Sequence, residues 1–517
     1  MREWLAFMLP PAIAFAGMRL ARLVLGQKFE DEFGFGLRFA IGLAVGMLVF
    51  SQAVLLTALA GINAARLLAW TAMIWGAVEV VLMCPKSATV LRLIQFRPAH
   101  LWLILLLPVL YSWWVFGRLC TLEGTIEFDA NAFWVFKAKV LYLEQGKHLM
   151  GILHQSSLGY AHMDYPLLVP CLYTLDYGLV NGVDEFVNKV WPFWMMVALC
   201  LATLSMGNAW KRPHPLPLLV VTLLCYLPAS LRFIRNEGGT IPMVFYTGLT
   251  ALLMVVAFSF DDEIALAAAL LTLAGCAMTK FEGILYAAIW GCATVAFCWR
   301  HRWLKNHLLW KVALVAAICL IPYFCFRLAK PVLHPESGWI RDGIASPGTV
   351  MRRFPQTWAL NIGSRFFSPD YFHWKTADKD HVQWDGQRAG LKSLVNPELS
   401  VLPWLLLFLF GFSLWWKGRH RLVLATLVGV IIIEFTILSF ITSCLGKMQA
   451  DVANVINFSS SSDLVGRYYY PFFTACFLGV ASVWFIEENT PAVSASPGPE
   501  SLHRTGWPPV LRKGAGP

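Results

Sequence analysis

The stretch Glu127–Pro170 reads EFDANAFWVFKAKVLYLEQGKHLMGILHQSSLGYAHMDYPLLVP. It concentrates polar, acidic and aromatic residues, and it lies between two apolar stretches, 100–118 and 188–207, that are long enough to cross a bilayer. A chain that keeps so polar a segment between spanning helices is expected to use it for chemistry at the membrane surface.

The composition of the whole chain places it in the membrane. Of its 517 residues, 58% are hydrophobic and only 14% are charged, and the mean hydropathy is +0.60. A soluble domain carries roughly 25% charged residues. Backbone in lipid must satisfy its own hydrogen bonds, and long apolar runs favour helices over a barrel. We therefore predict an all-α polytopic membrane protein.

The net charge of +10 does not indicate a nucleic-acid partner. Lys and Arg cluster in short loops between apolar runs, as membrane orientation requires. The twelve cysteines form no metal-binding spacing and lie mostly inside apolar runs, where they are expected to be packing residues.

The length rule predicts about thirteen transmembrane helices. They are expected near 4–18, 36–60, 64–84, 100–118, 188–207, 215–231, 241–260, 264–279, 284–299, 309–328, 399–416, 421–443 and 468–486.

The cationic loops set the predicted orientation. Clusters of Lys and Arg near 86–97, 211–212, 300–311 and 417–421 all fall on one side, which is taken as cytoplasmic. The opposite, external face then receives three long loops, in which short amphipathic helices are expected: 119–187, 329–398 and 444–467. The Pro-, Ser- and Gly-rich tail, 487–517, is expected to be disordered and cytoplasmic.

The first external loop carries the strongest candidate for catalysis. Residues 129–145 are expected to form an amphipathic helix on the surface, with Asp129 as its N-cap and Gly146 as its stop. A carboxylate at a helix N-terminus is held as the anion and can accept a proton from a hydroxyl. The alternative is that Asp129 only caps the helix.

Other external positions add further candidates. His162, Asp164 and Tyr165 precede Pro166, which favours the first turn of a helix. Glu237 follows two arginines at an external boundary, where a surface ion pair is the alternative to a substrate site.

Two further segments place charge next to apolar runs. Lys280 and Glu282 lie at a junction between two runs, where charged groups need a partner or a polar surrounding. Lys280 could hold a phosphate or could extend to the interface. Arg467 could bind a phosphate through two hydrogen bonds, with Tyr468 beside it, although the neighbouring tyrosines also fit an aromatic belt.

Four of these segments together resemble the GT-C superfamily of membrane glycosyltransferases, nearest the bacterial lipid-linked sugar transferases related to aminoarabinose transferase and protein mannosyltransferases. The segments are EFDANAFW, HMDYPLLVP, MTKFEGIL and GRYYYPFF. The resemblance covers 100–486, so residues 1–99 would be transmembrane helices added before a GT-C-like core. It implies a polyprenyl-phosphate sugar donor, a glycan, lipid or protein acceptor, and a bacterial inner membrane.

The resemblance also implies residue roles. Asp129 matches the acid that acts as general base, with Glu127 as the alternative, and Glu237 resembles the second acidic position. Lys280 and Arg467 resemble the cations that hold the donor phosphate. His162, Asp164, Tyr165, Glu282 and Tyr468 are assigned to substrate binding. The segment NEGGTIP lacks the paired acids of some relatives, so a divalent metal is possible but not required. No metal ligands are assigned.

Two other functions remain open. Glu79 and Glu434 lie inside apolar runs and would suit a secondary transporter or a lipid flippase. A non-catalytic assembly protein is the third possibility. An enzyme predicts that Asp129, Glu237, Lys280 and Arg467 line one external cavity, whereas a transporter predicts that Glu79 and Glu434 face one cavity at the midplane of the membrane.

Overall fold

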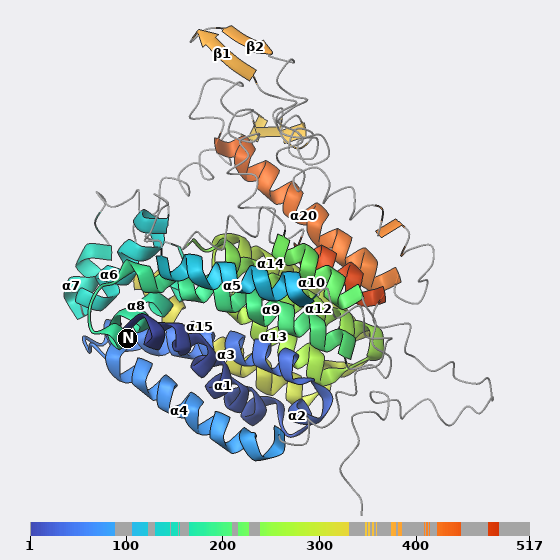
Figure 1. The fold of residues 1–517 in the computed structure, drawn as a ribbon. Helices are drawn as coiled ribbons and strands as arrows, with labels where there is room; N and C mark the ends of the chain where they lie inside the picture. The colour runs from blue at the N-terminus through green and yellow to red at the C-terminus, as the bar shows by residue number, and fades with distance from the viewer. Residues whose placement is uncertain are drawn as a thin grey trace, which may run out of the picture.

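The computed structural model describes residues 2–87, 106–122, 130–144, 146–153, 155, 165–208, 216–226, 238–329, 374–378, 381–384, 421–445 and 474–484, together with a few single or paired positions between 347 and 413. These residues form a helical bundle (Figure 1). Its N-terminal half contains α1 (Arg2–Leu25), α2 (Lys28–Glu32), α3 (Phe35–Leu59), α4 (Ala65–Ser87), α5 (Leu106–Leu122), η3 (Ala130–Val135), α6 (Phe136–Leu143), α7 (Gly146–Leu153) and α8 (Leu168–Val180).

The rest of the described chain continues the bundle. It contains η5 (Glu185–Lys189), α9 (Val190–Asn208), α10 (Leu216–Tyr226), α12 (Thr240–Phe260), α13 (Glu263–Ala277), α14 (Phe281–Arg300), η6 (Trp303–Lys305), α15 (His307–Ala329) and α20 (Arg421–Leu445). A short antiparallel hairpin, β1 (Trp374–Asp378) with β2 (His381–Trp384), pairs Trp374 with Trp384 and departs from a purely helical protein.

Seven of the described helices are long and apolar enough to cross a membrane, which is compatible with a multi-pass membrane protein. They are Trp4–Leu25, Phe35–Leu59, Ala65–Met83, Glu185–Met206, Thr240–Phe260, Phe281–Arg300 and His307–Phe326. Five more apolar helices are shorter, among them α8 and α13. The helical class is therefore shown, whereas the expected thirteen spans and the GT-C arrangement stay predictions.

Helix α3 ties the N-terminal helices to the rest of the bundle. It packs against α1 and also against α8, α9 and α13. A Cβ on Gly17 of α1 would come within 1.9 Å of the carbonyl oxygen of Gly42 in α3, so the two backbones meet because neither position carries a side chain. The expected division at residue 99 stays a prediction, but α3 packs on helices from both sides of it.

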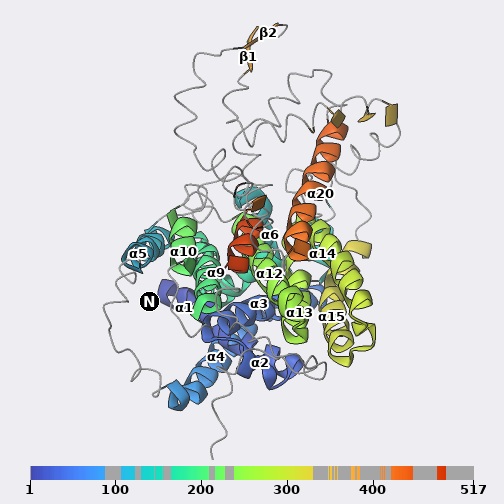
Figure 2. The same cartoon turned by 90° about the vertical axis from the view of Figure 1, so that its right-hand side faces the viewer.

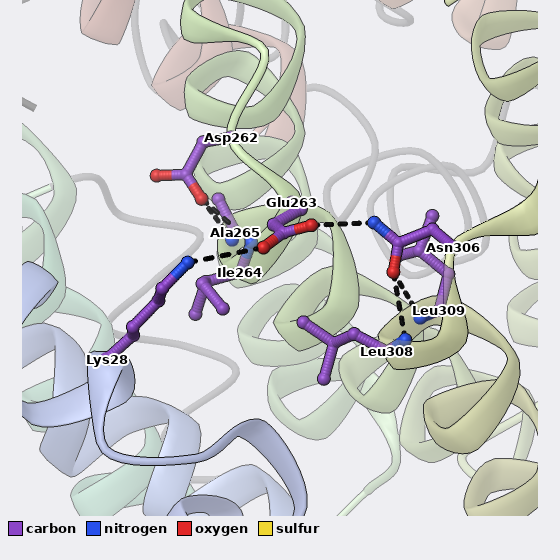
Figure 3. A network of polar contacts seen from close by, with 8 residues as sticks. All are labelled: Lys28, Asp262, Glu263, Ile264, Ala265, Asn306, Leu308 and Leu309. Carbon is purple, nitrogen blue, oxygen red and sulfur yellow. Dashed lines mark hydrogen bonds and ion pairs between the residues drawn. The ribbon is translucent and has the colours of Figure 1, made fainter. Parts of the chain in front are cut away.

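One end of the bundle is closed by a polar network, which Figure 3 shows from close by. Asp262 caps α13 by accepting hydrogen bonds from the backbone N–H groups of Ile264 and Ala265, at 2.8 and 2.9 Å. Glu263 accepts hydrogen bonds from Lys28 at 3.4 Å and from Asn306 at 2.6 Å. The network thus joins α2 to the first turns of α13 and α15, and we call this the capped end.

The opposite end of the bundle gathers the described parts of the first long loop, with α6, α7 and α8 together in Figure 1. Helix α13 has 15 residues and runs from the capped end to this one, so the two ends lie ~22 Å apart. The backbone N–H of Leu168, at the start of α8, donates to the carbonyl oxygen of Met278 at 3.3 Å. Gly178, near the end of α8, packs against Ala65 at the start of α4. Both ends of α8 therefore lie at this loop end.

The expected surface helix 129–145 is wrong in two respects. The chain forms a six-residue π-helix, η3, followed by α6, and the helix does not lie on the surface, since Lys137, Ala138, Val140 and Leu141 are all buried. Helix α8 packs on α6, and the hydroxyl of Thr174 in α8 donates to the carbonyl oxygen of Ala138 at 3.3 Å. Gly146 does not stop this helix; α6 ends at Leu143, and Gly146 begins α7.

Candidate functional site

Residues from four separate stretches of the chain meet at the loop end. The rings of Trp134 and Tyr165 have their centroids 5.9 Å apart, and Tyr165 meets Phe281 edge to face at 5.0 Å. Lys280 donates a hydrogen bond to the hydroxyl oxygen of Thr240 at 3.4 Å. We call this group the aromatic–lysine cluster: Trp134, Lys137, Tyr165, Gly239, Thr240, Lys280 and Phe281.

The backbone that presents Trp134 is unusual. Ala130–Val135 forms a π-helix, a conformation that is rare and that occurs frequently at functional sites. It passes into the regular helix α6 at Phe136, so the side chains before and after this point follow different helical periods. The π-helix begins at the residue that follows Asp129 in the sequence.

Lys137 is the most deeply placed charge of the cluster. Its side chain is fully buried, and its Nζ atom lies 5.6 Å from the ring centroid of Trp134 and 5.5 Å from that of Tyr165. Removing an ammonium group from water is costly, and two aromatic faces offset part of that cost through their quadrupoles. The charge of Lys137 therefore links the segment that carries Trp134 to the segment that carries Tyr165.

Gly239 permits the close approach of the other side of the cluster. A Cβ at this position would lie 2.7 Å from the Trp134 ring and 2.9 Å from Cε of Lys280. Real Cβ atoms essentially never come so near to another heavy atom. Trp134 and Lys280 can therefore both reach the N-terminus of α12 only because residue 239 lacks a side chain.

Lys280 and Glu282 occupy the junction between α13 and α14. Lys280 is the N-cap residue of α14 and is 8% exposed. Glu282 lies in the first turn of α14, where the helix dipole favours a negative charge. Glu282 is 9% exposed, and its Oε2 atom has no hydrogen-bond partner among the described residues. The predicted junction is confirmed, and it brings a buried cation and a buried carboxyl group to the loop end.

The structure brings together some of the predicted site residues. Tyr165 and Lys280 belong to one cluster, and Glu282 is two residues from Lys280. Seven others lie outside the described residues: Glu127, Asp129, His162, Asp164, Glu237, Arg467 and Tyr468. Asp129, Asp164 and Glu237 each directly precede in sequence a described residue at the loop end, namely Ala130, Tyr165 and Gly238.

Five residues of the cluster are not among the predicted site residues: Trp134, Lys137, Gly239, Thr240 and Phe281. Trp134 and Lys137 fall within 129–145, which is expected to be a surface helix. A lysine three residues after a tryptophan, inside an otherwise apolar face, was the available signal for Lys137. The local sequence does not indicate that Trp134 and Lys280 lie beside Gly239.

The transport hypothesis concerns Glu79 of α4 and Glu434 of α20, whose helices lie apart in the bundle in Figure 1 and Figure 2. Glu79 accepts a hydrogen bond from Trp75 at 3.3 Å and forms an ion pair with Arg19 at 3.8 Å, which joins α4 to α1. Helix α20, which contains Glu434, lies on another side of the bundle from α4 in both Figure 1 and Figure 2. Glu79 is therefore accounted for by its partners in α1 and α4.

Within the described residues, no group of three or more His, Cys, Asp or Glu side chains is placed to hold a metal ion.

Comparison of the chain with family models, with curated proteins and with solved structures finds no match.

Proposed function

We propose that the chain is a membrane glycosyltransferase that moves a sugar from a polyprenyl-phosphate donor to an acceptor hydroxyl at the external face. One observation carries the proposal. Three of the four segments on which the sequence resemblance rests have described residues at one place: Trp134 from the first, Tyr165 from the second, and Lys280 with Phe281 from the third. The fourth segment, with Arg467, lies outside the described residues.

The contacts favour an enzyme site built at a junction of elements. Tyr165 and Phe281 are more than a hundred positions apart and pack their rings together, and two buried lysines, Lys137 and Lys280, belong to the same cluster. The buried Glu282 lies two residues from Lys280 in the sequence. Buried charge is expensive, and such groups concentrate at functional sites. A polar site at the end of an apolar bundle suits a substrate whose lipid chain stays in the bilayer while its phosphate and sugar lie at the surface.

The chemistry assigns each group a task. Asp129 takes the proton of the acceptor hydroxyl, with Glu127 as the alternative base, while the hydroxyl oxygen attacks the anomeric carbon from the face opposite the phosphate. The bond between the anomeric carbon and the phosphate oxygen breaks, and polyprenyl phosphate leaves with the electron pair. Lys280 and Arg467 stabilise the charge on the leaving phosphate. Attack in line inverts the anomeric configuration.

The remaining residues hold the substrates in this scheme. Glu237 acts as the second acidic group, and His162, Asp164, Glu282 and Tyr468 contact the sugar or the acceptor. Tyr165 is buried under Lys137 and therefore acts by holding the first loop in place.

The loop end is assigned to the external face by the distribution of cations. The capped end carries Arg22 and Lys28 between α1 and α2, and Arg300, Arg302 and Lys305 between α14 and α15. Positive residues in short loops mark the cytoplasmic side, and acidic residues contribute little to this rule. The opposite end, with the aromatic–lysine cluster, then faces outward.

The proposed activity can be measured without knowing the sugar. Purified protein in liposomes is incubated with a panel of polyprenyl-phosphate sugars and a mixture of lipid and glycan acceptors, and products are identified by mass spectrometry. The expected result is consumption of one donor, release of polyprenyl monophosphate and a new glycoside. A panel in which no donor is consumed more than in empty liposomes would contradict the proposal.

The role of Asp129 has its own test. Asp129→Asn removes the proton acceptor but keeps the size of the side chain, so the turnover number is expected to fall by about 10²–10⁴. Glu144→Gln, at the end of α6, is the matched control and should keep full turnover. Unchanged thermal unfolding of both variants shows that folding is intact, and full activity in Asp129→Asn removes this residue from the mechanism.

A further inference from the structure

The aromatic–lysine cluster contains a charge to which the resemblance assigns no task. Lys137 lies on the first turn of α6 and is fully buried. Its Nζ atom lies over the ring of Trp134 and over the ring of Tyr165, which come from two separate parts of the first external loop. Tyr165 contacts Lys137 on one side and the ring of Phe281 on the other, and Phe281 is the residue next to Lys280. The ring of Trp134 also lies beside Gly239, and the side chain of Lys280 approaches the same glycine. Lys137 is thus connected to the α13–α14 junction by two separate routes.

A neutral side chain would serve poorly at this position. Aliphatic bulk can fill the space, but it is not attracted to the ring faces as an ammonium group is. A desolvated cation held by two rings also prefers one arrangement of those rings, whereas apolar contacts are not directional.

We propose that Lys137 is a positioning residue whose charge fixes the rings of Trp134 and Tyr165, and through them holds the first loop against Lys280. The proposal rests on the proposed function only for its turnover measurement. Its structural part concerns the order of the described residues and stands or falls without any substrate.

Four variants separate charge from bulk. Lys137→Met keeps the length of the side chain and removes the charge, whereas Lys137→Arg keeps a cation that can lie over the rings. Tyr165→Leu removes one of the two rings. Lys139→Met is the matched control, because Lys139 lies on the same helix but is partly exposed and pairs with Glu185 of η5.

Hydrogen–deuterium exchange of the protein in detergent micelles gives the first readout. In Lys137→Met, peptides that cover 165–175 are expected to exchange about tenfold faster than in the wild type. Lys137→Arg should restore slow exchange, and Lys139→Met should leave these peptides unchanged. Unchanged exchange in Lys137→Met, or equal acceleration in Lys137→Arg, would overturn the proposal.

A double-mutant cycle on thermal unfolding gives the second readout. Because Lys137 and Tyr165 act on each other, the double variant Lys137→Met with Tyr165→Leu is expected to unfold no earlier than the less stable single variant. Additive shifts would mean that the two side chains act independently and would overturn the proposal. If Lys137→Met does not fold, the exchange of Tyr165→Leu and Lys137→Arg decides: faster exchange of the 130–144 peptides in the first alone supports the coupling, and any other outcome refutes it.

Turnover with the donor that the wild type consumes gives the third readout. Lys137→Met should lower kcat about tenfold and change the donor KM less than threefold, since the residue orients the site and does not bind the donor. Lys137→Arg should recover most of the loss. If the wild type consumes no donor, the proposed function fails, while the exchange and unfolding measurements still decide the role of Lys137.

Discussion

Two adjacent glycines show how finely single residues shape the loop end. Gly239 faces the Trp134 ring and the Lys280 side chain at distances below 3 Å from a hypothetical Cβ, whereas the nearest atom to a Cβ on Gly238 is Nε1 of Trp134 at 3.9 Å. Neither glycine has a positive φ angle, so alanine meets no backbone strain at either position. The two positions therefore differ in available space alone.

The pair gives a matched test at the residue scale. Gly239→Ala is expected to destabilise the protein by about 1–3 kcal/mol, because the methyl group forces Trp134 and Lys280 to move. Gly238→Ala should be neutral or raise stability by a few tenths of a kcal/mol, since alanine restricts the unfolded chain. Unfolding temperatures measured in one detergent compare the two directly. Equal temperatures would show that the close approach at Gly239 does not exist in solution.

Among the elements, the capped end depends on the start of α13. Asp262 satisfies two backbone N–H groups there, and Glu263 links the same turn to α2 and to the start of α15. One short acidic turn thus fastens three elements. In the sequence, Asp261–Glu263 is an acidic segment on the side of the membrane where the other short loops carry Lys and Arg.

The cap at Asp262 leads to a prediction for the element as a whole. Asp262→Ala should lower the free energy of unfolding by about 1 kcal/mol relative to Asp262→Asn. Both substitutions remove the charge, but asparagine keeps an oxygen that can accept the two hydrogen bonds, so their difference isolates the cap. Chemical denaturation in micelles provides the measurement, and variants of equal stability would refute the capping role.

Glu32, at the end of α2, makes the stability of the capped end depend on pH. Burial is the main reason that its pKa rises from 4.5 to about 7, with repulsion from Asp262 as the second cause. A raised pKa means that the folded protein binds this proton more tightly than the unfolded chain does. Its contribution to stability is therefore complete below about pH 4.5 and is lost as the pH rises through about 7.

Glu32→Gln should remove this dependence, because glutamine stays neutral at every pH. The variant and the wild type are expected to unfold at similar temperatures at pH 5, and the variant should be the more stable at pH 8. Unfolding temperatures recorded between pH 5 and pH 8 test the difference. A difference that stays constant over this range would show that Glu32 titrates as it does in water.

The elements also show what the sequence could and could not predict. Long apolar runs located α3, α12 and α15 to within a few residues, because spanning length and composition are local properties. The first turn of a helix was expected at Pro166, and α8 begins at Leu168, but its 13 residues are too few to span a membrane, so the length rule did not include it. The burial of α6 could not be predicted from its own sequence, because α6 is buried by its packing against α8. The π-helix η3 has no sequence signature that periodicity can detect.

At the scale of the whole molecule, the capped end and the loop end lie at opposite ends of the helical bundle. Helices α12, α13, α14 and α15 run alternately between the capped end and the loop end, so residues 134, 165, 239 and 280 meet although they are distant in sequence. The expected spans and the cationic loops predicted a common side of the membrane for these segments. Contact between them could not be predicted, because it depends on how the helices pack.

The central claim is transfer of a sugar from a polyprenyl-phosphate donor at the external face. The most direct test measures on which side of the membrane the donor is consumed. A panel of short-chain polyprenyl-phosphate sugars that do not cross a sealed bilayer is added to right-side-out and to inside-out membrane vesicles that contain the protein. Release of polyprenyl monophosphate is followed by mass spectrometry. We predict release by right-side-out vesicles only, because the proposed function assigns the aromatic–lysine cluster to the external face. Release by inside-out vesicles alone, or by neither preparation, would contradict the account.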